Sequence, residues 1–158
     1  MTYHVDIQHA SNMLPPVSDS AIIGWVTHTL TNRIDSGEIT LRVVDEEEIE
    51  TLNETYRKIK KPTNVLAFPA DYPEEIELDC NLLGDIIICP AVLSRESLAL
   101  NINPEAHWAH IVIHGVLHLL GYDHIKQQDA DKMQPIEIEL LRLLGFENPY
   151  QAEEHSVE

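Results

Sequence analysis

Three histidines, His114, His118 and His124, have the spacing of metal ligands. On a helix, residues four apart lie on one face and one turn apart, so the imidazoles of His114 and His118 can reach the same ion. Gly121 permits a turn at positive φ, which would bring His124 back over that ion. Three imidazoles leave a fourth position open for water, and this is the arrangement of a catalytic zinc rather than of a closed structural one.

The pattern H-x-x-x-H-x-x-G-x-x-H matches the histidine helix and turn of the metzincins. Histidine is abundant here, at 9 of 158 residues, yet independent placement would produce this three-histidine spacing only about 0.03 times per chain. His107 and His110 lie upstream on the same predicted helix. His110, one turn before His114, could compete as a ligand, but we expect it to pack or to orient a ligand. Trp108 is expected in the core.

One residue separates this pattern from that of a zinc protease. Such a protease carries glutamate directly after the first histidine, where it acts as the general base. Here that position holds Gly115. Peptide hydrolysis by this route therefore lacks its proton carrier, and the pattern favours another kind of substrate.

The charge of the chain restricts the substrates that it can bind. The formal net charge is −17, whereas affinity for nucleic acid comes largely from lysine and arginine at phosphates. Of ten lysines and arginines, four lie in the run YRKIKK: Arg57, Lys58, Lys60 and Lys61. This run could be a local phosphate-binding patch, or a solvated helix end whose positive charge complements the helix dipole.

Predicted strands and helices alternate along the chain. We expect strands near 3–8, 38–45, 65–70 and 82–89, and helices near 19–34, 46–57, 90–100, 104–120 and 129–144. The strand 82–89 is almost wholly apolar, so we place it at the centre of the sheet. The predicted fold class is α+β, with one small mixed β-sheet and several helices.

Particular residues predict where the helices begin and end. Ser18 or Asp19 would cap the first helix, and Asp45, followed three residues later by Glu48, would cap the second. Gly145 would stop the last helix. Pro135 predicts a kink or a late start within it.

At 158 residues, the chain is long enough for one hydrophobic core that needs no metal or disulfide to fold. We expect a single domain over residues 1–150 and an acidic flexible tail over 151–158. The sequence shows neither a secretory signal nor a membrane span, so we expect a cytoplasmic protein. Cys80 and Cys89 are expected to be buried free thiols.

With Gly115 in place, the stretch HGVLHLLGYDH resembles the signature of the YbeY family of bacterial metal-dependent endoribonucleases. The stretches LNETYRKIKKPTNVLAFP, LLGDIIIC and PEAHWAHIVIHGVLH are similar to further blocks of the same family, in the same order. With the closing LGFENPY, the resemblance extends from about Tyr3 to Gln151.

This resemblance implies one zinc ion per chain, held by His114, His118 and His124, and cleavage of single-stranded RNA. It implies a role in ribosomal RNA processing, at the three-prime end of the small-subunit RNA, and in ribosome quality control. The expected partners are ribosomal RNA and the ribosome or a ribosome-associated protein, with no DNA and no membrane.

The resemblance also suggests which residues act. Arg57 matches an arginine that is regarded as essential in the family, so Arg57 and His114 are the expected catalytic residues. Zinc would polarise a phosphate oxygen or lower the pKa of its bound water, while the planar guanidinium of Arg57 holds the phosphate. Lys58, Lys60 and Lys61 would extend the substrate contacts.

Some features depart from the family or stay open. The family's Thr-Asp-Val-Leu-Ser-Phe-Pro reads here as TNVLAFP, so Asn64 and Ala67 replace a carboxylate and a hydroxyl. Asp123 could orient an imidazole or a water molecule, or only stabilise the turn. No general base is evident, and three imidazoles also accept nickel, copper or iron.

Two alternative functions remain. The first is a zinc hydrolase that acts on another phosphoester or on an amide, for which the histidine spacing is equally suitable. The second is a ribosome-assembly factor without catalytic activity, in which zinc stiffens the helix and turn.

Overall fold

A mixed four-stranded sheet forms one layer of the computed structural model, which describes residues 2–70, 81–122 and 127–150, with the backbone alone for 127–131. The strands are β1 (Thr2–Ala10), β2 (Ser36–Val44), β3 (Val65–Pro69) and β4 (Leu82–Ile88), in the order β1-β2-β4-β3. The β1–β2 and β2–β4 pairs are parallel, whereas β3 pairs antiparallel with β4. β4 is thus internal, as its apolar run predicted.

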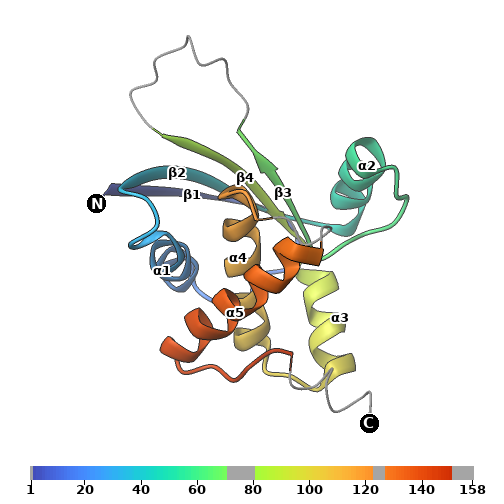
Figure 1. Cartoon of the computed structure of the whole chain (residues 1–158). Helices are drawn as coiled ribbons and strands as arrows, with labels where there is room; N and C mark the ends of the chain where they lie inside the picture. Colours follow the sequence, from blue (N-terminus) through green and yellow to red (C-terminus); the bar gives the residue numbers. More distant parts are fainter. Residues whose placement is uncertain (1, 71–80, 123–126, 151–158) are drawn as a thin grey trace.

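Five helices are described: α1 (Asp19–Leu30), α2 (Glu46–Arg57), α3 (Pro90–Leu100), α4 (Pro104–Leu119) and α5 (Gln127–Leu143). In Figure 1, α4 lies against the sheet between α1 and α3, and α5 crosses it. α4 contacts all three of these helices and also strands β3 and β4. Within the described residues, no helix is both long enough and apolar enough to cross a membrane.

The hydrophobic core is centred on α4. The indole of Trp108 is only 1% exposed, which confirms its predicted place in the core. Ile86 and Ile88 of β4 belong to this main core, while Ile87 points to a smaller cluster beneath α2. β4 therefore carries apolar side chains on both faces, as expected for an internal strand.

The thiol of Cys89 is free and buried at the end of β4, as predicted. Burial raises the pKa of this thiol, so it is held in its unreactive protonated form. Cys80 lies outside the described residues.

The cap residues of α1 and α2 lie where the sequence predicted them, but only the first makes a capping hydrogen bond. Ser18 caps α1, and its hydroxyl accepts a hydrogen bond from Ala21 N. Asp45 occupies the cap position of α2, but its carboxylate makes no capping bond there. It accepts hydrogen bonds from Ser11 Oγ and Asn12 N, because the chain after β1 returns to this point.

Other boundaries differ from the prediction. α1 ends at Leu30 rather than near Ile34, because Thr31 leaves the helical conformation and Asn32 has a φ of 67°. Of the two alternatives predicted for Pro135, the late start is wrong, since α5 begins at Gln127 and continues through the proline. Gly145, with a φ of 89°, follows the end of α5 as predicted.

Gly84 allows β3 to approach β4 closely. Its φ is 139°, and a Cβ atom there would lie 2.2 Å from the carbonyl oxygen of Phe68. Only glycine combines this conformation with so little space. The close approach fixes the position of β3, which forms one wall of the cavity described next.

Candidate metal centre and active site

Helix α4 carries the first two predicted metal ligands, and its ends are set by local sequence. The Oδ1 atom of Asn103 accepts a hydrogen bond from Glu105 N at the start of the helix, and Pro104 occupies its first turn. At the other end, Gly121 has a φ of 106°. The predicted helix with a glycine turn after it is therefore confirmed.

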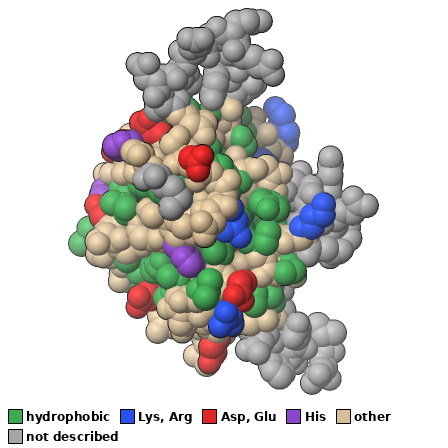
Figure 2. All heavy atoms as spheres, turned by 60° about the vertical axis from the view of Figure 1, so that its left-hand side comes forward, with side chains coloured by type: hydrophobic (Ala, Val, Ile, Leu, Met, Phe, Trp, Pro, Cys, Tyr) green, Lys and Arg blue, Asp and Glu red, His purple; other side chains and the backbone are tan. Residues whose placement is uncertain are grey.

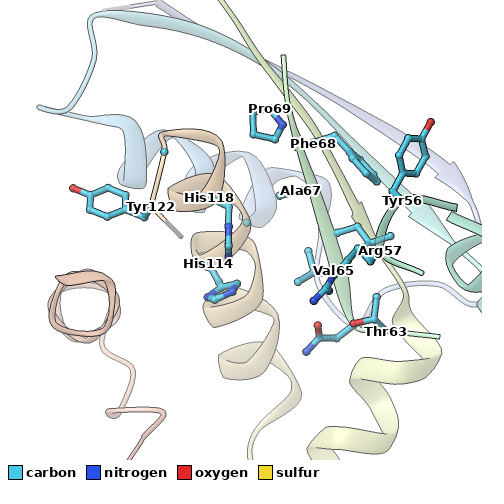
Figure 3. A pocket seen from close by; sticks show the side chains of 14 residues that line it. Tyr56, Arg57, Thr63, Val65, Ala67, Phe68, Pro69, His114, His118 and Tyr122 are labelled. Atoms are coloured by element: carbon cyan, nitrogen blue, oxygen red, sulfur yellow. The ribbon is translucent and has the colours of Figure 1, made fainter. Parts of the chain in front are cut away.

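His114 and His118 lie one turn apart, with ring centroids separated by 4.8 Å. Both line a cavity of about 660 Å³, whose wall also includes β3 and the end of α2. Figure 3 shows the two imidazoles projecting from α4, while Arg57 and Thr63 approach from the side of β3. Two imidazoles are thus presented together at the surface of one cavity.

The third predicted ligand, His124, lies outside the described residues, as does Asp123. Their assignment as a ligand and as an orienting residue stays a prediction. The observed pair fits a zinc ion, because imidazole nitrogens one turn apart are a common zinc donor set. The same donors also suit other late transition metals.

A buried carboxylate lies behind His114. Glu137 of α5 is 1% exposed, and its oxygens accept hydrogen bonds from His110 Nε2 at 2.6 Å and from His114 Nδ1 at 3.2 Å. The hydroxyl of Tyr150 donates a third hydrogen bond at 2.8 Å. Burial pushes the pKa of Glu137 upward, but the hydrogen bonds from His110 and His114 outweigh it and lower the pKa to about 2. Glu137 is therefore ionised at neutral pH.

The donor atoms of His110, His114 and Glu137 lie within 4.8 Å of one another, so this group could also hold a metal ion. Among the described residues, however, it is His114 and His118 that line the cavity shared with Arg57, whereas His110 lines a different one. A metal that acts on a ligand in the Arg57 cavity is better placed at His114 and His118.

Arg57 is the last residue of α2, and its exposed side chain lines the cavity. Lys58 follows with a φ of 62°, which ends the helix. Lys58, Lys60 and Lys61 are exposed but are not among the residues that line the cavity. The structure therefore brings Arg57 to the histidines and leaves the lysines outside their cavity.

Basic side chains do not form a continuous surface on the face shown in Figure 2. There they are separate spots among hydrophobic, acidic and histidine side chains. The formal net charge of the molecule is −17, so the guanidinium of Arg57 is a local positive charge in the cavity of an acidic protein.

Asn64 lines the cavity and is held from behind by Glu96. Its Nδ2 atom donates to both carboxylate oxygens of Glu96, at 3.2 and 3.3 Å. The buried His107 also contacts Glu96, through Nε2 at 2.9 Å. Burial raises the pKa of Glu96, but the hydrogen bonds from His107 and Asn64 lower it overall. An amide suits this position because an aspartate would face the charge of Glu96.

Gly115 is buried where α4 packs on β4. A Cβ atom at this position would lie 3.2 Å from Cγ2 of Ile86. A larger residue at this position would require Ile86 to shift, although Gly115 also lines the cavity. Glycine therefore suits the close packing of α4 on β4 at the position where a zinc protease carries its general base.

Comparison with known proteins agrees with this architecture. The family model described as Endoribonuclease YbeY matches residues 8–145 of the chain. The chain belongs to the YbeY family. Endoribonuclease YbeY of Legionella pneumophila is 53% identical over 158 residues, which is 100% of both chains. Endoribonuclease YbeY of Pseudomonas putida is 49% identical over 150 residues, 95% of this chain and 94% of the relative.

A solved structure supports the predicted fold class. The solution structure of TM1509 from Thermotoga maritima matches with a TM-score of 0.60 at 25% sequence identity. The match covers 85% of this chain and 86% of the other. The α+β prediction is confirmed.

Sequence reasoning missed Glu137 in this YbeY-family chain, although a signal was present. Glu137 lies four residues after Met133 and three before Leu140, and all three side chains are buried on one stripe of α5. A carboxylate within a buried helical stripe needs hydrogen-bond donors. The need for a donor could have suggested a nearby histidine such as His110 as the hydrogen-bond partner of Glu137.

Proposed function

We propose that the chain is a metal-dependent endoribonuclease that cleaves single-stranded RNA during ribosomal RNA processing. The observation that carries the proposal is the cavity itself, in which two imidazoles of α4 and the guanidinium of Arg57 line one space. The expected target is the three-prime end of the small-subunit RNA, with ribosome quality control as a further role in the cytoplasm. Family membership supports RNA as the substrate.

The proposed ligand set is His114, His118 and His124, with zinc as the metal. When bound, zinc would supply Lewis-acid polarisation of a phosphate oxygen. Arg57 binds the same phosphate, since its planar fork can donate to two oxygens and stabilise negative charge that develops during cleavage. Asn64, held by Glu96, offers a hydrogen-bonding group on the adjacent wall.

Two aromatic rings favour an unpaired substrate. Tyr56 is 63% exposed and packs edge-on against Phe68, with ring centroids 5.0 Å apart, and both line the cavity. An unpaired base can stack on an exposed tyrosine ring, whereas a base in a duplex is already stacked on its neighbours. Lys58, Lys60 and Lys61 would contact the RNA backbone outside the cavity.

The test is cleavage of a labelled single-stranded RNA by the purified chain and by its His118→Ala variant, prepared side by side. Cleavage that is lost in the variant supports the proposal. Equal cleavage by both preparations would indicate a contaminating nuclease and contradict it.

DNA and peptide substrates should be compared in the same experiment. We expect neither to be cut. Cleavage of peptide but not of RNA would favour a different zinc hydrolase instead.

A further inference from the structure

Three hydrogen-bond donors surround the buried carboxylate of Glu137. Its Oε1 accepts a hydrogen bond from His114 Nδ1, while Oε2 accepts from His110 Nε2 and from the hydroxyl of Tyr150. The side chain is 1% exposed, so solvent contributes little to holding it. Donors from α4 and from the end of the described chain fix the carboxylate in one position.

We propose that Glu137 is a positioning residue that orients His114 and selects the nitrogen that the ring offers to the metal. This inference rests on the proposed function, because it concerns His114 as a metal ligand. It assigns Glu137 no contact with the metal or with RNA.

The chemistry of imidazole determines which nitrogen of His114 carries the proton. A neutral ring carries one N–H group, and an ionised carboxylate only accepts hydrogen bonds. The contact with Glu137 therefore places the proton of His114 on Nδ1 and the lone pair on Nε2. Histidine ligands in metal sites commonly donate their second N–H group to a carboxylate in this way.

The position of the ring supports the same assignment. His114 lines the cavity beside His118, whereas Glu137 lies behind it in the core. Figure 3 shows both imidazoles on the cavity side of α4. His110 and Tyr150 hold the carboxylate, so their role is to keep Glu137 aligned with His114.

The first test measures zinc affinity of the full chain by competition with a chromophoric chelator. Glu137→Gln keeps the size of the side chain but replaces one acceptor oxygen with an NH₂ group. We expect this variant to bind zinc about ten- to hundredfold more weakly than the wild type. Glu139→Gln is the matched control, since Glu139 is on the same helix but is exposed and paired with Arg142; its affinity should be unchanged.

The second test reads the His114 ring directly, without metal. Nitrogen–proton correlation spectra of the metal-free protein should show the proton on Nδ1 in the wild type and a mixture of tautomers in Glu137→Gln. A role in packing alone would not change the tautomer. Should Glu137→Gln fail to fold, Glu137→Asp is the replacement, because it keeps the charge but withdraws the carboxylate from His114.

The outcomes separate this inference from the proposed function. Zinc binding that is lost in His118→Ala but unchanged in folded Glu137→Gln would overturn the positioning role alone. Zinc binding that is lost in Glu137→Gln but kept in His118→Ala would make Glu137 a ligand and overturn both. Weakened binding in Glu137→Gln, loss in His118→Ala and a changed His114 tautomer together support both.

Discussion

At the scale of single residues, Arg57 is the clearest test of how the cavity binds phosphate. Its side chain is exposed and lines the cavity, so its replacement should affect ligands rather than folding. A charge-assisted hydrogen bond contributes about 1.5–3 kcal/mol, and lysine cannot reproduce the two-oxygen contact of arginine.

We therefore expect Arg57→Lys to lower kcat/KM on single-stranded RNA by about tenfold or more. Metal content per chain and the melting temperature should stay at wild-type values. Full activity in this variant would remove Arg57 from the mechanism.

Glu96 provides a test of stability against pH. Burial raises the pKa of Glu96, but the hydrogen bonds from His107 and Asn64 outweigh this effect, so the pKa is lowered in the folded protein. A carboxyl group with a lowered folded-state pKa stabilises the fold above its unfolded pKa, and this contribution disappears as pH falls through the folded-state pKa.

Glu96→Gln should therefore be less stable than the wild type at neutral pH, and the two should converge as the pH falls through the carboxyl range. Urea unfolding at a series of pH values measures this difference. Glu54→Gln, which changes an exposed carboxylate, is the control. A difference that stays constant with pH would mean that ionisation of Glu96 does not contribute.

At the scale of helices and strands, Gly115 tests the packing of α4 on β4. A Cβ atom there would lie 3.2 Å from Cγ2 of Ile86, so a larger residue requires Ile86 to shift. We expect Gly115→Glu to destabilise the fold by about 1–3 kcal/mol, the usual effect of overpacking.

Gly24 is the matched helical control, because a Cβ atom at this exposed position would meet nothing within 4 Å. Gly24→Ala should stabilise α1 by about 0.5–1 kcal/mol. Denaturant unfolding of both variants measures the contrast. If Gly115→Glu were as stable as the wild type, the close helix–sheet contact would be wrong.

The sequence predicted those elements whose signals are local. The apolar run of β4, the proline at the start of α4 and the turn at Gly121 each depend on neighbouring residues alone. Contacts between distant segments were not predictable in this way. Asp45 binds Ser11 rather than capping its own helix, and Glu137 meets His110 across 27 positions of the chain.

The site shows the same division. The spacing of His114 and His118 and the role of Arg57 could be proposed from sequence, since helix geometry and a family motif were enough. That Arg57 shares their cavity while the lysines do not depends on the αL residue at Lys58 and on the course of β3. Such long-range placement has no signature in a single sequence.

At the scale of the whole molecule, metal and fold should be separable. The core around α4 is built from apolar side chains, with Trp108 and its neighbours buried. We expect a chelator to abolish RNA cleavage while circular dichroism still shows a folded chain. The melting temperature should fall only as far as the loss of the metal's binding free energy lowers the free energy of unfolding. Unfolding upon chelation, with cleavage never detected, would favour a structural zinc.

The net charge predicts how the chain binds free RNA. With a formal net charge of −17, the protein as a whole repels the phosphates of RNA, and Arg57 attracts them only locally, in the cavity. Affinity for an isolated single strand should be weak and should fall further with added salt. Fluorescence anisotropy at several salt concentrations measures this; tight binding that salt does not change would contradict it. Weak binding would support the proposal that the ribosome or a partner protein presents the substrate.

The edge position of β3 determines which backbone groups this wall of the cavity can offer to a ligand. Among the described strands, β3 pairs only with β4, so one edge of its backbone has no strand partner, and its residues Val65–Pro69 line the cavity. Hydrogen bonds from the backbone do not depend on the side chain. A substitution of Ala67, whose side chain packs against the main core, would therefore leave the backbone donors and acceptors of this strand edge in place. Replacement of a histidine of α4, in contrast, removes the imidazole nitrogens themselves.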